Sequence, residues 1–152
     1  MRSVHHPFGS MLLVGAAALL LTACSPLTSR HTIPAGSDRA LDLSIEAMSF
    51  VPDRLEVKVG ETVTFFISNP RDDPHEAFIG SAADQLIHET AHQAIAAGKQ
   101  ASMAHMGYGI FIDAHGSGTL TYHFAKTGTI LIGCHLPGHY AAGMVAAIIV
   151  EP

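Results

Sequence analysis

From residue 41 onward, apolar and polar residues alternate along three short stretches of the chain. The alternation is clearest at Leu41–Ile45, Leu55–Val59 and Val63–Ile67, where every second side chain is apolar. A period of two places one face of a strand on a core and the other face toward solvent. Gly60 and Glu61 separate the second and third stretches, so the sequence predicts a tight hairpin at this point.

The pattern becomes helical after residue 80. Ser81 followed three residues later by Asp84 is typical of a helix start, because both side chains can satisfy free backbone amides. Apolar residues then recur at roughly helical spacing, and Gly98 fits a helix end. These apolar residues are Leu86, Ile87, Ala91, Ala94 and Ile95. The sequence predicts a helix over 82–97 and a loop rich in glycine, methionine and histidine over 98–118.

Strand patterns return in the last part of the chain, at Thr119–Phe124, Thr129–Gly133 and Val145–Val150. The last of these stretches is apolar throughout, as expected for a strand that is covered on both faces. About six to eight short strands with one inserted helix predict an antiparallel β-sandwich of Greek-key type. The expected fold class is therefore all-β.

The N-terminal residues have the composition of an export signal. An uncharged apolar run, Met11–Leu21, is shorter than the ~20 residues needed to span a bilayer. Leu21–Cys24 resembles the lipobox of bacterial lipoproteins, in which the cysteine becomes the first mature residue and carries the lipid. This resemblance implies a signal peptide over 1–23 and a periplasmic, membrane-anchored protein. Ser25, with no aspartate after the cysteine, indicates the outer membrane. The alternative is an ordinary secretory signal.

The rest of the chain divides into a linker and one domain. Residues 24–40 mix Pro, Ser, Thr and Gly with little periodicity and predict a flexible tether. Residues 41–152 are enough for a single domain with a core of its own. The chain has 8 Lys+Arg against 13 Asp+Glu. This acidic balance argues against nucleic-acid binding, which favours a basic face.

With a lipid on Cys24, Cys134 has no disulfide partner within the chain. An odd cysteine in an exported protein is an intermolecular link, a reactive thiol or a ligand. His139 and Met144 follow it at spacings of five and five, on the connection between two predicted strands. A loop of this size can curl so that the three side chains converge. A thiolate, imidazoles and a weak thioether favour copper in a trigonal site with a long axial bond. His75, which follows an upstream turn, is the best candidate for the second imidazole.

With these residues, the chain from about Leu41 to Val150 resembles the cupredoxins, the plastocyanin and azurin family of blue copper proteins. The resemblance rests on the C-terminal Cys…His…Met loop, the final strand and the distant upstream histidine. It implies that one type 1 copper ion has the equatorial ligands His75, Cys134 and His139 and the axial ligand Met144. It also implies single-electron transfer with a redox partner protein, without an enzymatic reaction. The sequence leaves the redox potential, the partner and the oligomeric state open.

The sequence departs from plastocyanin and azurin at two points. Glu76 stands where those proteins have an asparagine after the upstream histidine, which puts the hydrogen bond to the cysteine sulfur in doubt. The insert over 81–118 is not part of a minimal plastocyanin, and it is similar to inserts in copper-binding cupredoxins of bacterial envelopes.

Other metal and thiol sites fit less well. A multicopper oxidase has a histidine before the cysteine, where this chain has Gly133, and paired His-x-His motifs, which this sequence lacks. A copper-A site needs two cysteines in one loop, and a zinc site favours more Cys or His and no Met. A nucleophilic pair of Cys134 with a neighbouring histidine would leave His75 and Met144 unexplained.

Further histidines and methionines lie in and after the predicted helix. His88 and His92 are four residues apart and therefore share a face. The loop that follows adds Met103, His105 and Met106. One interpretation is a second, weaker copper site built from these five residues, suited to copper tolerance, buffering or delivery. The interpretation we prefer from sequence is a solvent-facing helix and a loop that contain them by chance. His135 is expected to point away from Cys134, behind the ligands or at the surface.

Overall fold

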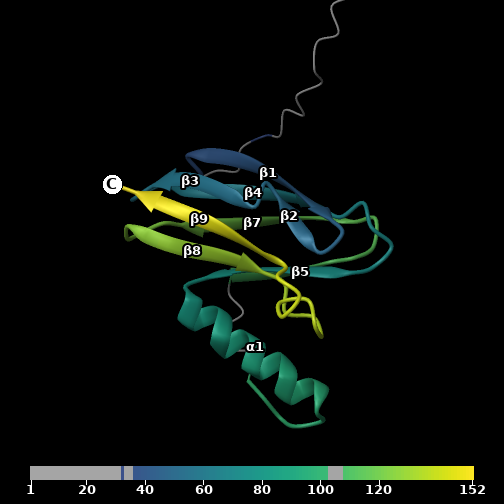
Figure 1. Ribbon diagram of the computed structural model, residues 1–152. Coiled ribbons are helices and arrows are strands. Elements are labelled where there is room, and N and C mark those ends of the chain that lie inside the picture. Colours follow the sequence, from purple (N-terminus) through teal and green to yellow (C-terminus); the bar gives the residue numbers. More distant parts are fainter. Residues whose placement is uncertain (1–31, 33–35, 103–107) are drawn as a thin grey trace, which may run out of the picture. The chain divides into compact units, whose positions relative to one another are not determined.

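The computed structural model describes residues 32, 36–102 and 108–152, and it shows two β-sheets packed face to face with one helix outside the second sheet (Figure 1). One sheet has the strand order β2-β1-β4-β7, and the other has the order β3-β9-β8-β5-β6. The elements are β1 (Arg39–Glu46), β2 (Ser49–Val51), β3 (Arg54–Lys58), β4 (Thr62–Ser68), β5 (His75–Gly80), α1 (Ala82–Ala96), β6 (Gly109–Ile112), β7 (Ser117–His123), β8 (Gly128–Gly133) and β9 (Val145–Glu151). The predicted all-β sandwich with one inserted helix is confirmed. The predicted signal peptide, Cys24 and the loop residues Met103, His105 and Met106 lie outside the described residues.

The first sheet begins slightly before the expected domain start at residue 41. The Asp38 backbone N–H donates to the carbonyl of Thr62 at 2.8 Å, and the Asp38 carboxylate accepts the Thr62 N–H at 2.8 Å. The hydroxyls of Ser37 and Thr64 are 2.6 Å apart. The last residues of the predicted tether are therefore fixed to β4, along which β1 runs in parallel.

The predicted hairpin at Gly60–Glu61 is wrong. The turn itself is tight, with the N–H of residue 61 donating to the Lys58 carbonyl at 3.1 Å, but the strands on either side lie in different sheets. β3 pairs in parallel with β9, whereas β4 pairs with β1 and β7. Val57 and Phe65 both face the same core from opposite sheets, so their alternation does not reveal whether the strands pair. The two parallel pairs also make both sheets mixed, where the sequence predicted antiparallel ones.

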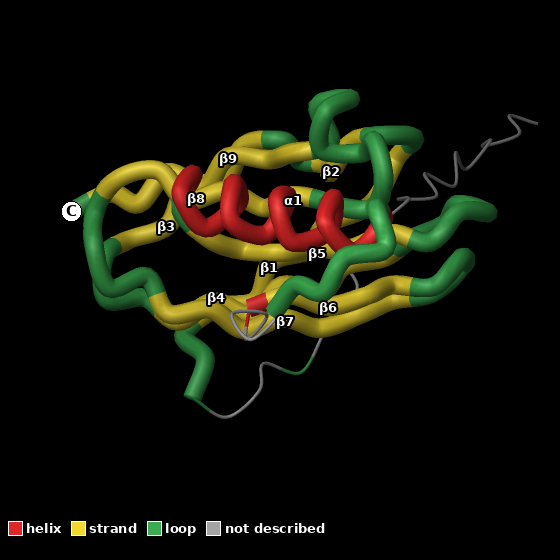
Figure 2. Tube along the Cα trace, turned by 90° about the horizontal axis from the view of Figure 1, so that it is seen from below, coloured by secondary structure: helices red, strands yellow, loops and turns green. Residues whose placement is uncertain are grey.

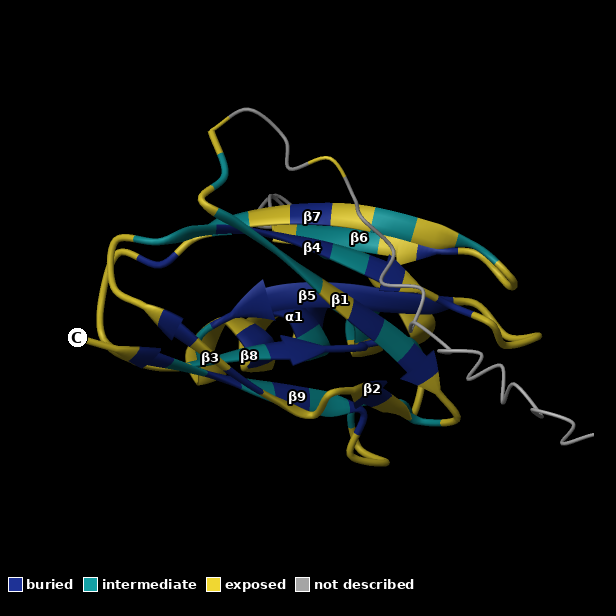
Figure 3. Cartoon of the chain, turned by 90° about the horizontal axis from the view of Figure 1, so that it is seen from above, coloured by how far each residue is buried: buried dark blue, intermediate teal, exposed yellow. Residues whose placement is uncertain are grey.

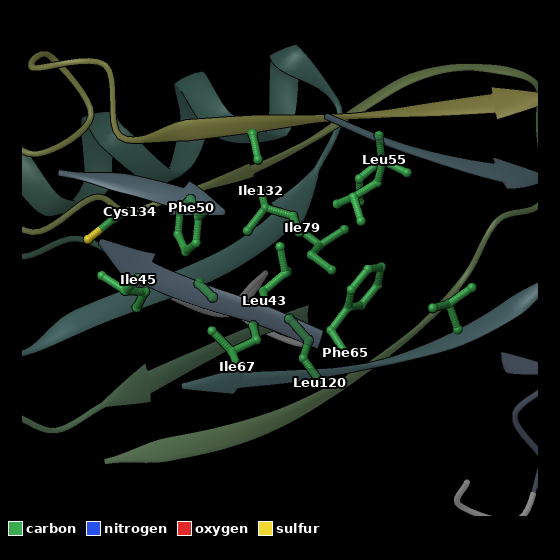
Figure 4. Packing of buried hydrophobic residues seen from close by; sticks show 14 of the residues in the cluster. Leu43, Ile45, Phe50, Leu55, Phe65, Ile67, Ile79, Leu120, Ile132 and Cys134 are labelled. Carbon is green, nitrogen blue, oxygen red and sulfur yellow. The ribbon is translucent and has the colours of Figure 1, made fainter. Parts of the chain in front are cut away.

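The core lies between the two sheets and extends to the candidate ligands (Figure 4). Its largest fully buried side chains are Leu43, Ile45, Phe50, Phe65, Ile67, Ile79, Ile112, Phe124, Ile132 and Ile148. Burying one such side chain contributes about 1.5–3 kcal/mol. Cys134 and Met144 belong to the same cluster and are 0% exposed, and Cys134 lies at one end of it. Packing in the apolar core therefore holds the cysteine in place.

Two predictions about the second half of the chain need correction. β6 lies inside the stretch 98–118 that was expected to be a loop, and it pairs with β5 at the edge of the second sheet. β9 was expected to be covered on both faces. Its inner residues are buried, whereas its outer residues Val145, Ala147 and Ile149 are only half-buried. The helix packs against β5 and β8, which leaves the outer face of β9 without such a cover.

Helix α1 starts as predicted. The Ser81 hydroxyl accepts the Asp84 N–H at 3.3 Å, and the Asp84 carboxylate accepts the Ser81 N–H at 2.8 Å. The apolar spacing identified the helix but not its buried face, since Leu86, Ile87 and Ile95 are 67%, 54% and 47% exposed. The buried residues of the helix are instead Gln85, His88 and Ala91. No described helix is long and apolar enough to cross a bilayer.

The helix lies across the outer face of β5 and β8 (Figure 2). All six residues of β5 are buried, because its inner face packs on the core and its outer face lies under α1 (Figure 3). Gly133 at the end of β8 permits this close approach. A Cβ atom at Gly133 would lie 2.5 Å from Gln85 Oε1 and 2.9 Å from the Tyr140 ring. Helix α1 is thus a packed layer of the domain.

Candidate metal centre

Three of the four predicted ligands lie together at one end of the sandwich. The Cys134 sulfur is 3.9 Å from His75 Nδ1 and 3.4 Å from His139 Nδ1. The two imidazole rings have centroids 5.0 Å apart. His75 and Cys134 are buried, and His139 is half-buried at the edge. One sulfur and two ring nitrogens can therefore reach a common ion.

The loop from Cys134 to Met144 closes through its own backbone. The Cys134 N–H donates to the Met144 carbonyl at 3.1 Å, and the Met144 N–H donates to the His139 carbonyl at 3.1 Å. Gly138 supplies a turn with φ of 86°, a conformation that favours glycine. Of the three side chains predicted to converge, those of Cys134 and His139 lie together, with Sγ 3.4 Å from Nδ1. The Met144 side chain is buried in the same cluster, and its axial role stays a prediction.

The protonation states of the metal-free cluster are set mainly by burial. Burial raises the pKa of the Cys134 thiol, opposed by backbone N–H groups of Glu76 and Leu136. Burial, together with the nearby His139, lowers the pKa of His75. His75 is therefore held neutral, as a metal ligand must be, whereas the buried thiol needs a cation to displace its proton. A thiolate with two imidazoles is a donor set that fits copper.

The hydrogen bond to the cysteine sulfur, which the sequence left in doubt, comes from the backbone of Glu76. Its N–H donates to Cys134 Sγ at 3.3 Å. A backbone donor does not depend on which side chain follows His75. The replacement of asparagine by glutamate therefore leaves this N–H in place and frees the side chain for other contacts.

A second cluster lies under the helix, where Glu76, His88 and His92 bring one carboxylate and two imidazoles together. Glu76 Oε1 is 2.9 Å from His88 Nε2, and Glu76 Oε2 is 3.4 Å from His92 Nε2. The side chains of Glu76 and His88 are 4% and 0% exposed. The preferred interpretation of a solvent-facing helix is therefore wrong for its histidine face. The physical reason is that His88 stacks on Phe78 of β5, with ring centroids 4.0 Å apart, so the imidazoles face the sheet.

The carboxylate of the second cluster is ionised in spite of its burial. Burial by itself raises the pKa of Glu76, but the contacts with His88 and His92 and the backbone N–H of His135 together bring it below its usual value. In the described part of the chain, the buried His92 Nε2 has no hydrogen-bond partner, because its contact with Glu76 lacks the geometry of one. An anionic carboxylate beside an unsatisfied imidazole nitrogen fits a divalent cation such as copper or zinc.

His135 lies behind the ligands, as one of the two predicted positions had it, and it is buried. Its Nδ1 is 2.8 Å from Glu89 Oε2, and its Nε2 is 2.6 Å from Gln85 Oε1. Its ring also stacks on Tyr140, with centroids 4.4 Å apart. Because both ring nitrogens contact side chains of α1, His135 links the helix to the loop from Cys134 to Met144.

Alternation along the strands explains why the two clusters are neighbours. Successive side chains of a strand point to opposite faces of the sheet. His75 contributes to the first cluster, and the next residue, Glu76, contributes to the second. In the same way Cys134 faces the core and His135 faces the helix. The consecutive residues His75 and Glu76 thus serve two sites on opposite faces of one sheet, whereas His135 contacts the helix beside the second site.

A cavity of about 410 Å³ lies between α1 and the loop from Cys134 to Met144. Its lining combines polar residues of the helix, His92 among them, with His135 and with small or apolar residues such as Ala96, Pro137 and Ala141. The His92 side chain is 21% exposed. The cavity therefore gives an access route from solvent to the second cluster.

Sequence reasoning missed Glu76, Gln85 and Glu89 as parts of this region. In the sequence, Glu76 stands out only because plastocyanin and azurin have an asparagine at this position. The available signal was a lone carboxylate in the apolar strand His75–Gly80, next to a predicted ligand. A buried charge of this kind needs a partner, and His88 and His92 were the nearest unassigned candidates.

Comparisons with known proteins identify the family and the fold. Residues 38–151 match the model of the family described as copper binding proteins, plastocyanin/azurin family. A relative named copper-resistant cuproprotein CopI, from Pseudomonas aeruginosa, is 30% identical over 93% of this chain and 92% of its own length. A protein of the same name from Rubrivivax gelatinosus is 32% identical over 70% of this chain and 62% of its own length. The solved structure of reduced auracyanin from Roseiflexus castenholzii has a TM-score of 0.62 and 23% identity, covering 77% of this chain and 100% of that one, which shows the fold.

Proposed function

Since this chain belongs to the plastocyanin/azurin family of copper-binding proteins, we propose that it handles copper in the cell envelope and thereby contributes to copper tolerance. The observation that carries this proposal is the second cluster of Glu76, His88 and His92, which stands beside the cysteine site. A simple electron carrier needs one ion, whereas a protein that buffers or delivers copper gains from a second binding position. The names of the two copper-resistant relatives support the same function.

In the proposed first site, His75, Cys134 and His139 would hold copper, and Met144 would add a weak thioether donor. When bound, copper supplies one-electron chemistry by alternating between the cuprous and cupric states. The residues of the chain position the ligands. The buried sandwich fixes Cys134, and the Glu76 N–H at 3.3 Å orients its sulfur. A rigid donor set that suits both oxidation states limits the rearrangement between them.

In the proposed second site, the side chains of Glu76 and His88 are buried, whereas the partly exposed His92 lines the cavity. The set has oxygen and nitrogen donors and lacks sulfur, so it holds cupric ion or zinc without an intense visible colour. Because His92 is partly exposed, an ion can exchange here more readily than at buried Cys134. We propose that this position is the exchangeable one.

The deciding experiment is a titration of the purified protein with cupric ion, with absorption spectra and a count of bound copper. We expect an intense thiolate-to-copper band that saturates at one equivalent, followed by a second equivalent that adds little to this band. His92→Ala should lose the second equivalent and keep the first. As a control, His123→Ala removes an exposed histidine of β7 that belongs to neither cluster and should keep both equivalents. Saturation of wild-type protein at one equivalent would contradict the copper-handling role.

A second candidate function is electron transfer, and the position of His139 favours it. This ring is half-buried in a loop with Pro137 and Ala141, small and apolar neighbours that suit a brief encounter with a redox partner. We propose no reaction of the chain's own in either case. A single tightly held ion together with rapid electron exchange between copies, measured by NMR line broadening, would favour this candidate over copper handling.

We also propose attachment to a membrane through a lipid on Cys24, in the periplasm. The lipobox-like Leu21–Cys24 supports this proposal. Mass spectrometry of the protein recovered from membranes should find a lipid-modified N-terminus at Cys24. Cys24→Ser should release the protein to the soluble fraction, whereas Ser25→Ala should not. Recovery of unmodified protein cleaved before residue 24 would contradict the anchor.

A further inference from the structure

Glu76 contacts both clusters at once. Its backbone N–H donates to Cys134 Sγ at 3.3 Å. Its carboxylate oxygens lie 2.9 Å from His88 Nε2 and 3.4 Å from His92 Nε2. One residue thus joins the sulfur of the first site to the ligand set of the second.

The Glu76 carboxylate also holds the backbone of the residue that follows Cys134. Glu76 Oε2 accepts the backbone N–H of His135 at 3.3 Å, and His135 is bonded to Cys134 through its peptide. Covalent and hydrogen bonds therefore form a closed ring through Glu76, Cys134 and His135. Glu76 is 3% exposed, so solvent screens this ring little, and electrostatic effects across it are strong.

We propose that Glu76 couples the two sites, so that a divalent cation bound at Glu76, His88 and His92 raises the reduction potential of copper held at Cys134. This inference rests on the second site proposed above. A cation on the carboxylate competes with the His135 N–H and makes the Glu76 backbone N–H a stronger donor to the sulfur. A more strongly hydrogen-bonded thiolate stabilises cupric copper less. The added positive charge also favours the cuprous state, so both effects act in one direction.

Coupling of this kind is reciprocal. If a cation in the second site favours cuprous copper in the first, cuprous copper must raise the cation affinity of the second. We expect about a tenfold difference in affinity, within the range typical of coupled sites. A tenfold difference corresponds to a rise of about 59 mV in a one-electron potential.

The experiment uses the full chain carrying one equivalent of copper and titrates it with zinc, which undergoes no redox change. The zinc affinity is measured once with cupric copper in the first site and once with cuprous copper. The reduction potential of the copper is measured with and without zinc. We expect about tenfold tighter zinc binding to the cuprous protein and a matching rise in potential. The thiolate-to-copper band should shift as zinc binds.

Two matched variants test the role of Glu76 itself. Glu76→Gln keeps the backbone N–H but removes the charge, so it should keep the intense band and lose the zinc-induced shift. Glu89→Gln removes another carboxylate from the same region, one that contacts His135 Nδ1 at 2.8 Å but neither cluster, and should keep the shift. A shift that persists in Glu76→Gln would overturn the proposal.

The remaining outcomes separate this inference from the proposed function. Zinc that binds wild-type protein equally well in both copper states, with no change in potential, overturns the coupling and leaves the second site standing. Absence of zinc binding beyond the cysteine site overturns both. If Glu76→Gln fails to fold, the test is the NMR signal of the Glu76 backbone N–H in wild-type protein that carries cuprous copper. Movement of this signal on zinc binding supports the coupling, and an unmoved signal overturns it.

Discussion

The two clusters stand on opposite faces of one sheet, yet the chain builds them in different ways. Most of the first comes from one short loop, Cys134 to Met144, closed by its own backbone hydrogen bonds and completed by His75. The second needs β5 and α1 to pack together before its carboxylate meets its imidazoles. The first is therefore as stable as the sandwich, whereas the second depends on the docking of one helix.

The two clusters also differ in what surrounds them. Cys134 and Met144 are part of the apolar core between the sheets. The interface under α1 is largely polar, with His88, Gln85 and His135 buried among hydrogen bonds. Apolar packing tolerates small changes of shape, but a buried polar group that loses its partner carries a large cost. The comparison indicates that mutations will separate the two sites cleanly.

The largest expected effect comes from Cys134→Ser. A hydroxyl does not supply the thiolate that gives the visible charge-transfer band, so the band should disappear completely. The second cluster contains no sulfur and should still bind one equivalent of zinc, measured by equilibrium dialysis. An intense band in the variant would show that Cys134 is not the copper ligand.

The next effect separates the two histidines of the second cluster. His88→Ala leaves the buried carboxylate of Glu76 without its closest partner and removes the ring that stacks on Phe78. We expect a loss of about 3 kcal/mol in the free energy of unfolding of metal-free protein, measured in urea. His92 is partly exposed, so His92→Ala should lower it by only about 1 kcal/mol or less. Equal losses would contradict the buried arrangement.

Met144→Leu should have a smaller effect, confined to the first cluster. Leucine fills a similar volume, so the unfolding free energy should change by less than about 1.5 kcal/mol. The intense band should remain, while the reduction potential rises because a weak donor to cupric copper is lost. Redox titration checks this prediction, and an unchanged potential would argue against an axial Met144.

The smallest effect is a pH dependence of the metal-free protein. Burial lowers the pKa of His75 and of His135 below the usual 6.5, so the unfolded chain takes up protons first as the pH falls. Glu76 has its pKa below the usual 4.5, so its contribution is also lost at lower pH. Stability should therefore fall below about pH 6.5, by at most about 1.4 kcal/mol per pH unit for each group, and further below pH 4.5. Urea unfolding at pH 7.5 and 5.5 tests this, and greater stability at pH 5.5 would contradict it.

The sequence predicted the elements of the fold better than their pairing. The alternation at Leu55–Val59 and Val63–Ile67 correctly indicated strands, but these strands lie in opposite sheets. Alternation reports only that one face of a strand is buried. The partner of a strand depends on contacts far along the chain, such as that of β3 with the C-terminal β9.

For the sites, the limit was the orientation of the helix. Ser81 and Asp84 marked its start correctly, because a capping box is a local arrangement. Its exposed Leu86 and Ile87 gave the apolar periodicity, although the helix docks through Gln85 and His88. No local pattern shows that a histidine face is buried when the surface that receives it, Glu76 and Phe78, comes from another strand.

The sequence by itself determined the all-β class, the capped helix and the order of His75, Cys134, His139 and Met144, because these features depend on residue type and short-range spacing. Only the tertiary structure decided which strands pair, that the histidine face of α1 lies on β5, and that Glu76 joins the two clusters. These features arise where segments distant in sequence meet across the two faces of a sheet. Their physical cause is the fit between surfaces, which no single segment contains.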